Sequence, residues 1–218
     1  MKRLLFLMFF LLLLLSLTPA SATTIYTGTI IADSGFYSSY PSINAVNQSG
    51  LSDAYISGVT DFDTYAALNP THMYSSYTTG GALDNLPVFI DLDFGEALTF
   101  TDFGLWNDND YQGIKEFNIL VADNASFTGA TSLGSFTATY GPPGYSNPID
   151  LQLFDLDDAT GRYVRLNILS AHSSSIINFG EIIFGAETPA PVPEPATMIL
   201  LGSGLVGFTG LRKKFKKN

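Results

Sequence analysis

The side chains best suited to contact a ligand lie in three turn-rich segments of the chain, residues 107–113, 141–148 and 170–175. They are amides, carboxylates, tyrosines and one histidine: Asn107, Asp108, Asp110, Tyr111, Tyr145, Asn147 and His172. Aromatic rings offer apolar area and polar groups fix orientation, which is the combination that a sugar requires. Asn, Asp, Gly and Pro are also the ordinary residues of turns, so simple turn chemistry is the competing interpretation.

One carboxylate stands inside a hydrophobic stretch. Glu181 alternates in step with Ile177, Phe179 and Ile183, which predicts that its side chain faces a core. A buried glutamate needs a cation or strong hydrogen-bond donors to stay charged. The alternatives are an ion pair with Arg162 or Arg165, or an exposed position on a sheet edge.

Recognisable catalytic motifs do not occur in the sequence. Cysteine is absent, which removes thiol catalysis, disulfides and Cys-based metal sites. His72 and His172 stand in no nucleophile motif, and neither G-x-S-x-G nor H-E-x-x-H is found. Residues 108–113 open like an EF-hand loop, but the twelfth position is Ile119 instead of Glu. We predict that the protein is not an enzyme, although the many acids leave a glycosidase-like carboxylate pair open.

Acidic residues are concentrated between residues 23 and 188. This stretch holds 19 of the 20 acids and only three basic residues, Lys115, Arg162 and Arg165, for a formal charge of −16. Binding to nucleic acid is excluded, because neutralising phosphates needs clustered Lys and Arg. The same charge repels anionic polymers, so the expected glycans are neutral, or acidic and bridged by calcium.

Strands must position these residues, because short β-branched and aromatic runs recur between Gly, Pro, Asn and Asp without helical periodicity. The predicted strands are Thr24–Ala32, Val88–Asp93, Leu98–Trp106, Ile114–Ala122, Gly134–Tyr140, Ile149–Phe154, Arg162–Leu169 and Ile176–Gly185. A bulge near Thr101 and Asp102 would bring the two halves of Leu98–Trp106 into phase. Residues 33–87 are predicted as loops with one or two short strands.

Eight antiparallel strands indicate an all-β sandwich or barrel. Successive loops then alternate between its two ends, so the three candidate loops share one end. Trp106 is predicted in the core, because aromatic side chains are the main filling of such interiors.

The first 22 residues predict a secretory signal peptide. Lys2 and Arg3 precede a twelve-residue apolar run, Leu4–Leu15, which is too short to span a membrane. The small residues Ala20 and Ala22 predict cleavage by signal peptidase after Ala22. An uncleaved anchor is the alternative.

Three unlike segments end the chain. A proline-rich linker, residues 189–195, contains Pro193, Glu194 and Pro195; sixteen uncharged residues, 196–211, follow; and residues 212–218 form a basic tail. As a helix the sixteen residues span about 24 Å, a short membrane crossing whose basic end stays in the cytoplasm. A plain tail anchor is one interpretation. In their order, however, the three features resemble the PEP-CTERM sorting signal of Gram-negative bacteria.

This resemblance implies an export route. In that family an exosortase, a membrane enzyme, cuts near the Pro-Glu-Pro motif, so exosortase and signal peptidase are the expected processing partners. The resemblance also implies transient anchoring in the inner membrane and a final place in the cell envelope or extracellular matrix, often alongside exopolysaccharide.

A second resemblance covers residues 88–185. Five ordered segments resemble the discoidin-like module, also called the coagulation-factor C-type or galactose-binding-like domain: Val88–Gly95, Phe103–Asn107, Gly113–Phe117, Gly161–Leu166 and Gly180–Gly185. The resemblance implies a jelly-roll β-sandwich over residues 23–188 that binds sugars, lipids or proteins without catalysis. It also implies a structural calcium, whose candidate ligands are Glu181 and, from early loops, Asn47, Asp61 and Asp63.

Together these features predict an exported, noncatalytic protein that binds carbohydrate or an exopolysaccharide matrix. A structural or adhesive protein of the biofilm matrix, binding protein or itself, is the alternative. A glycoside hydrolase is the third hypothesis.

Overall fold

The computed structural model describes residues 23–73, 79–82, 86–108, 111–139, 148–172 and 176–188. The predicted signal peptide, the linker with Pro193, Glu194 and Pro195, the helix over 196–211 and the basic tail lie outside these residues. Within the described part of the chain, no helix is long and apolar enough to cross a membrane.

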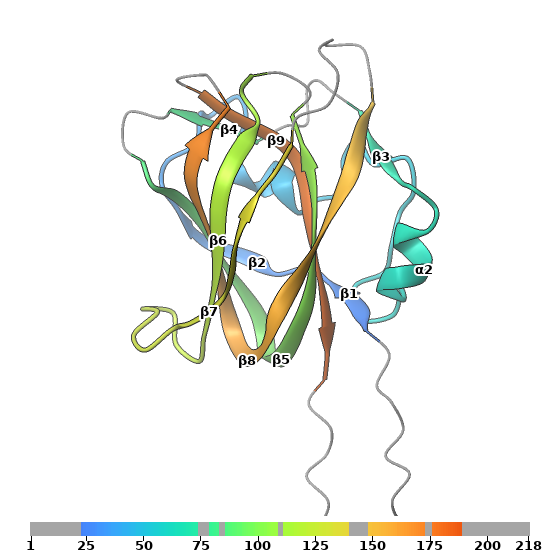
Figure 1. The fold of residues 1–218 in the computed structure, drawn as a ribbon, viewed down its shortest axis with the longest axis vertical. Coiled ribbons are helices and arrows are strands. Elements are labelled where there is room, and N and C mark those ends of the chain that lie inside the picture. The colour runs from blue at the N-terminus through green and yellow to red at the C-terminus, as the bar shows by residue number, and fades with distance from the viewer. Residues whose placement is uncertain are drawn as a thin grey trace, which may run out of the picture.

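Antiparallel strands make up most of the regular structure (Figure 1). The strands are β1 (Thr24–Tyr26), β2 (Thr29–Asp33), β3 (Thr71–His72), β4 (Thr79–Ala82), β5 (Val88–Asn107), β6 (Ile114–Ala122), β7 (Thr131–Thr137), β8 (Ile149–Ala171) and β9 (Ile176–Glu187). Two short helical turns, η1 (Ser42–Ala45) and α2 (Phe62–Ala66), lie in the first third. The all-β prediction is confirmed, whereas the two helical turns were not predicted.

The long strands β5 and β8 run through both layers of a β-sandwich. Hydrogen-bonded neighbours follow the order β1-β9-β5-β8-β6-β7, with β2 beside β5, β3 beside β8 and β4 beside β9. The first half of β5 pairs with β2 and with the second half of β8, whereas its second half pairs with β9 and with the first half of β8. The sequence predicts β5 and β8 as two strands each. In the structure each is continuous, with a break in the register of their pairing between Asp93 and Leu98.

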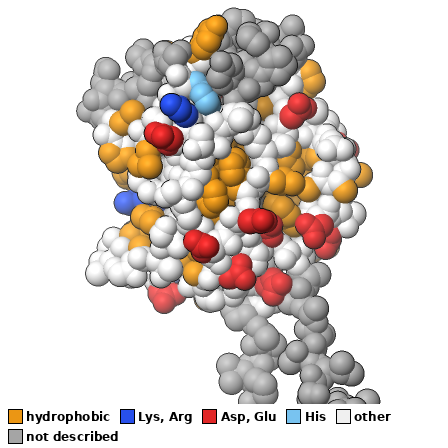
Figure 2. Space-filling model, viewed as in Figure 1, with side chains coloured by type: hydrophobic (Ala, Val, Ile, Leu, Met, Phe, Trp, Pro, Cys, Tyr) orange, Lys and Arg blue, Asp and Glu red, His pale blue; other side chains and the backbone are white. Residues whose placement is uncertain are grey.

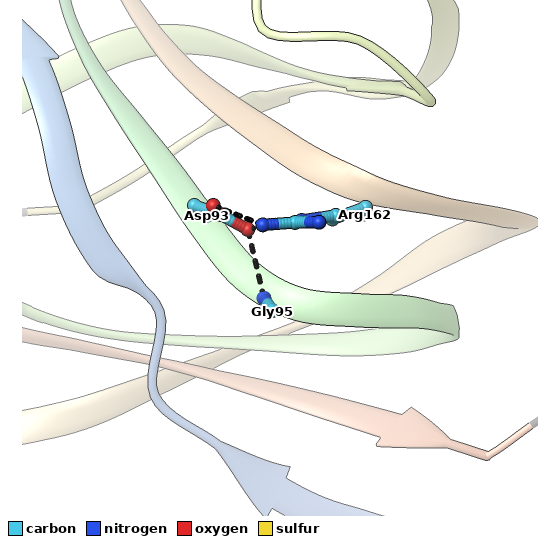
Figure 3. A network of polar contacts seen from close by, with 3 residues as sticks. All are labelled: Asp93, Gly95 and Arg162. Atoms are coloured by element: carbon cyan, nitrogen blue, oxygen red, sulfur yellow. Dashed lines mark hydrogen bonds and ion pairs between the residues drawn. The ribbon is translucent and has the colours of Figure 1, made fainter.

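An ion pair fixes the corner of β5 at this break (Figure 3). Asp93 accepts hydrogen bonds from Nε and Nη2 of Arg162, at 2.7 and 2.8 Å, and from the N–H of Gly95, at 2.8 Å. The hydrogen bonds from Arg162 hold the pKa of the Asp93 carboxyl below its usual value. Gly95 has a φ of 81°, which a residue without Cβ adopts at no steric cost.

The main core fills the space between the two layers. It is rich in phenylalanine: the ring of Phe103 lies 5.0 Å from that of Phe184 and 5.5 Å from that of Phe117, measured between centroids. The predicted bulge is confirmed by a register shift between Phe100 and Asp102, and it places Phe100 and Phe103 in the same core.

A second core lies on the outer face of the layer that contains β9. Its buried side chains are Ile25, Tyr55, Phe62, Tyr65, Trp106, Ile149 and Ile183. Trp106 is fully buried, as predicted, and donates its indole N–H to the carbonyl of Pro70 at 2.9 Å. The turn α2 covers this core and begins at Asp61, whose carboxylate accepts the N–H of Thr64 at 2.8 Å.

The two ends of the sandwich differ in what they carry. Thr24 pairs with Ala186, so residues 23 and 188 lie side by side at the lower end in Figure 1. The other end of β9 lies beside Asn107, which pairs with Phe179. The candidate loops therefore lie opposite the end at which the described chain begins and ends.

Several strand boundaries differ from the prediction. Thr24–Ala32, predicted as one strand, is divided into β1 and β2, which pair with different partners. Gly28 lies between them, where a Cβ atom would stand 2.9 Å from that of Leu92. Strand β7 begins at Thr131 instead of Gly134.

Candidate functional site

Asn107 fastens three segments together at the upper end of the sandwich. This loop end comprises residues 107–108, 111–115, 138–139, 171–172 and 178. The Asn107 side chain is 1% exposed, donates to the carbonyls of Ile114 at 2.7 Å and Thr139 at 2.9 Å, and accepts the N–H of Ile114 at 2.8 Å. Both its N–H bonds are thus used on the backbone, which fits a role in positioning the loops rather than in contacting a ligand.

His172 extends the same network. Its backbone N–H donates to the carbonyl of Gly113 at 3.2 Å, and its ring Nε2 lies 2.9 Å from the carbonyl oxygen of Ala138. The N–H of Ala138 donates in turn to the carbonyl of Lys115 at 2.8 Å. The loops that follow β5, β7 and β8 therefore meet at one end, as the antiparallel pattern predicts.

An exposed aromatic ring and two amides complete the loop end. Tyr111 is 52% exposed. Beside it in sequence, the carbonyl of Gln112 accepts the N–H of Asn178 at 2.9 Å, and the side-chain amide of Asn178 donates to the side-chain oxygen of Gln112. An exposed aromatic residue and fixed amide groups at one end of the domain are the kinds of group that contact the apolar face and the hydroxyls of a sugar.

Four of the predicted ligand residues belong to the described chain. Asp108 is fully buried and, like Asn107, fits a structural role, whereas Tyr111 and His172 remain the candidates for contact. Asp110, Tyr145 and Asn147 lie outside the described residues.

Sequence reasoning missed three residues of the loop end, Gln112, Lys115 and Asn178. Gln112 and Lys115 flank the turn at Gly113, and Asn178 lies in β9 directly after a predicted loop. Their position in the sequence could have identified them, because residues that flank the loops at one end of a sandwich come together whatever their residue type.

A β-bulge turns Glu181 into the second core. Between β5 and β9, Trp106 stands opposite two residues, Gly180 and Glu181. The extra residue reverses the alternation, so Glu181 shares a face with Ile183 and not with Phe179. Glu181 is fully buried, as predicted, but on the face opposite to the predicted one.

The environment of Glu181 favours its neutral form. Its Oε1 accepts the N–H of Gln48 at 2.9 Å, while Oε2 has no hydrogen-bond partner among the described residues. Burial raises the pKa of Glu181 to about 8, against the opposing effect of the Gln48 N–H. The alternative ion pairs with Arg162 and Arg165 are wrong, because these arginines bind Asp93 and Asp91.

His72 packs against Gly180, the residue that precedes Glu181. Its ring occupies the space next to Gly180, where a Cβ atom would lie 2.7 Å from the ring. Its Nε2 lies 3.0 Å from the carbonyl oxygen of Ser49, and burial lowers its pKa. Together His72, Gln48 and Glu181 hold the loop around Ser49 on the second core, which is a structural role.

The four predicted calcium ligands do not gather in one place. The Asn47 side-chain oxygen accepts the N–H of Ser49 at 2.8 Å, and Asp61 and Asp63 belong to the first turn of α2 and its cap. In the described parts of the chain, no three His, Asp or Glu side chains are arranged to hold a metal ion. Calcium takes six to eight oxygen ligands. Backbone carbonyl and amide oxygens can be among these ligands, so calcium stays a prediction.

A separate concavity of about 340 Å³ adjoins the second core. Its lining comes from the end of α2 and the start of β8: Ala66, Asn69, Asp150, Leu151 and Leu153. These lining residues include no aromatic side chain, in contrast to the loop end.

The C-terminal segment matches a known sorting signal. Residues 191–214 match the family model of the PEP-CTERM protein-sorting motif. The match contains Pro193, Glu194 and Pro195, so the predicted sorting signal is confirmed, and it marks an exported protein. No curated protein matches the chain in sequence.

Solved structures of similar fold include carbohydrate-binding modules. The CBM32 of AlyQ in complex with 4,5-unsaturated mannuronic acid is 17% identical, with a TM-score of 0.49, over 74% of this chain and 97% of that one. The chitosan-binding module 1 of a chitosanase/glucanase from Paenibacillus sp. IK-5 is 15% identical, with a TM-score of 0.49, over 76% and 98%. The family 32 CBM of C. perfringens NanJ in complex with galactose is 10% identical, with a TM-score of 0.46, over 76% and 98%. These likenesses concern the fold alone.

Proposed function

We propose that this protein is an exported, noncatalytic binding protein whose loop end holds carbohydrate of the extracellular matrix, the exopolysaccharide of its own cell included. The observation that carries the proposal is the 52% exposure of Tyr111 in the turn before Gln112, whose backbone and side chain are hydrogen-bonded to Asn178, at a loop end that Asn107 holds in place. Preformed polar groups around an aromatic face are typical of sugar sites.

The position of the chain ends supports this proposal. Residues 23 and 188 lie together at the end opposite the loops. The sorting motif follows residue 188, at residues 191–214. The loop end therefore lies opposite the point at which the described chain leads into the sorting segment, where an anchor at that segment leaves it accessible to a polymer.

The side chains of the loop end suit binding better than catalysis. The described carboxylate nearest to the turn, Asp108, is buried. The ring Nε2 of His172 faces a backbone carbonyl, that of Ala138, at hydrogen-bond distance. General acid–base chemistry on a glycosidic bond needs two exposed carboxyl groups across the scissile bond.

A glycan array probed with the full-length protein tests the proposal. Tyr111→Ala should abolish or strongly weaken the signal, because the variant loses the aromatic face. Tyr37→Ala is the matched control, since Tyr37 is 47% exposed against 52% for Tyr111 and lies outside the loop end. An array without any signal, with and without calcium, would overturn the proposal, as would equal losses in the two variants.

A structural or adhesive role is the second candidate. The exposed apolar side chains Ile56, Val59 and Leu68 favour it, with exposed fractions of 66%, 68% and 61% on the segment that covers the second core. Self-association in sedimentation experiments, lost on replacing Val59 by Ser, together with a silent array would support this role over sugar binding.

A further inference from the structure

Two of the three basic residues between residues 23 and 188 are locked in ion pairs. Nε and Nη2 of Arg165 donate to the two oxygens of Asp91 at 2.6 and 2.8 Å, and Arg162 makes the same two-bond contact with Asp93. The Arg165 guanidinium also lies 4.3 Å from the centroid of the Phe89 ring and 4.5 Å from that of Phe127. These two cations hold strands β5 and β8 together and offer no free charge to a ligand.

The third cation, Lys115, stands at the loop end. It is exposed and forms no ion pair with any described residue. It occupies a bulge of β6, because Ile114 pairs with Ala171 and Glu116 pairs with Ser170, which leaves Lys115 as the extra residue. Bulges redirect a side chain out of the regular alternation and are frequent next to binding sites.

Hydrogen bonds tie the Lys115 backbone to the candidate site. Its carbonyl accepts the N–H of Ala138, whose own carbonyl faces the ring of His172. The carboxylate of the neighbouring Glu116 accepts the hydroxyl of Ser170 at 2.8 Å. Figure 2 shows a basic side chain between a histidine and an acidic group near the upper end of the molecule, with most of the other acidic groups of that face lower down.

Resting on the proposed function, we infer that Lys115 is a specificity-determining residue and that the loop end selects a glycan with a carboxylate substituent, a uronic acid. The ammonium group of Lys115 would form a charge-assisted hydrogen bond with that carboxylate, while Tyr111 and the amides of Gln112 and Asn178 contact the rest of the ring.

This inference differs from the expectation drawn from net charge. Part of the acidic charge lies around Asp102, which interacts with Asp63, Asp155 and Asp158. Asp102 precedes Asn107 on the same strand by a distance of about 17 Å. At physiological ionic strength charges are screened over about 8 Å. The acids around Asp102 are therefore screened from the loop end, and the carboxylate of Glu116, beside Lys115 in sequence, is hydrogen-bonded to Ser170.

Paired oligosaccharides test the inference directly. Isothermal titration of the full-length protein would compare oligogalacturonate with its fully methyl-esterified form, in EDTA, so that calcium cannot bridge two carboxylates. The wild type should prefer the acid over the ester. Lys115→Gln should weaken binding of the acid about tenfold more than it weakens binding of the ester. Lys115→Arg, which keeps the charge, should retain most of the preference.

Thr131→Glu is the matched control for charge. It lowers the net charge by the same one unit, but Thr131 pairs with Val121 at the far end of β6. Equal binding of acid and ester, or equal losses in Lys115→Gln and Thr131→Glu, would overturn the inference and leave the proposed function intact. Binding of the acid only when calcium is added would overturn it in favour of metal bridging. A protein that binds no glycan on the array overturns both.

Discussion

Replacing Asn107 should separate the loop end from the rest of the sandwich. The Asn107 side chain holds the N–H and C=O of Ile114 and the C=O of Thr139 by three hydrogen bonds of 2.7 to 2.9 Å. In Asn107→Ala these backbone groups lose their partners at a place where Ile114 is fully buried. In Asn107→Asp the acceptor oxygen remains, but the two donors are replaced by a carboxylate oxygen that faces two carbonyls.

The expected loss of stability follows from the number of orphaned groups. A buried polar group left without its hydrogen bond costs about 1–3 kcal/mol. Three such groups, which share one small region and do not add independently, give about 3–5 kcal/mol for Asn107→Ala. Asn107→Asp should cost at least as much at neutral pH and less in acid, because the protonated carboxyl regains one donor.

Urea unfolding followed by tryptophan fluorescence measures both variants. Trp106 is the only tryptophan of the chain, is fully buried and adjoins Asn107, so its emission reports the loss of this region. Asn118→Ala is the matched control, because its side-chain oxygen is buried without a partner in the described structure and its removal should cost little. A loss in Asn107→Ala no larger than that in Asn118→Ala would refute the positioning role.

Three further predictions concern the second core and its strands. Glu181→Gln should remove a pH dependence of the free energy of unfolding. In the unfolded chain Glu181 ionises near its ordinary pKa of 4.5, whereas in the folded chain it stays protonated up to about 8. The wild type should therefore lose stability as the pH rises between these values, by up to about 5 kcal/mol in total. Urea melts across this range in EDTA measure it, and parallel pH profiles of the two proteins would contradict it. Thermal melts with calcium in place of EDTA test the metal predicted from the sequence. Calcium should raise the melting temperature of the wild type but not of Glu181→Gln, and no rise would contradict calcium binding. Gly104→Ala should destabilise by about 1–3 kcal/mol, because the new Cβ would lie 2.7 Å from Cγ1 of Ile183. Ile183→Ala should relieve part of that cost, and an undiminished cost in the double variant would place the strain elsewhere.

Strand periodicity predicted the parts of the fold where alternation is unbroken. Strand β6 has the predicted bounds, Ile114–Ala122, because Phe117, Ile119 and Val121 alternate regularly and all three enter the main core. Even the bulge at Thr101–Asp102 was predictable, since it leaves a visible change of phase in the sequence.

The register between strands was not predictable in the same way. The bulge at Gly180 and Glu181 reverses the face of Glu181, and it depends on pairing with Trp106, a residue far away in sequence. The helical turn α2 has a local sequence signal, because Asp61 caps the N–H of Thr64 three residues later. Its stability, however, comes from the burial of Phe62 and Tyr65 in the second core.

The location of the candidate site was predictable from the sequence, whereas the contacts of its individual side chains were not. Antiparallel alternation brings the loops after β5, β7 and β8 to one end, as the hydrogen bonds of Asn107 and His172 show. The pattern of residue types did not separate Asn107 and Asp108, which are buried, from Tyr111, which is exposed. In the sequence nothing distinguishes Lys115 from the other residues of its predicted strand, because the bulge of β6 depends on pairing with β8.

Hydrogen–deuterium exchange of the full-length protein, with and without a saturating oligosaccharide from the array, tests the central claim most directly. Binding at the loop end predicts slower exchange in the segments around Tyr111–Lys115, Ala138 and His172, and unchanged exchange in β1 and α2. Slower exchange confined to β1, to α2 or to the concavity beside Leu153 would contradict the account, because the ligand would then occupy a different face of the domain.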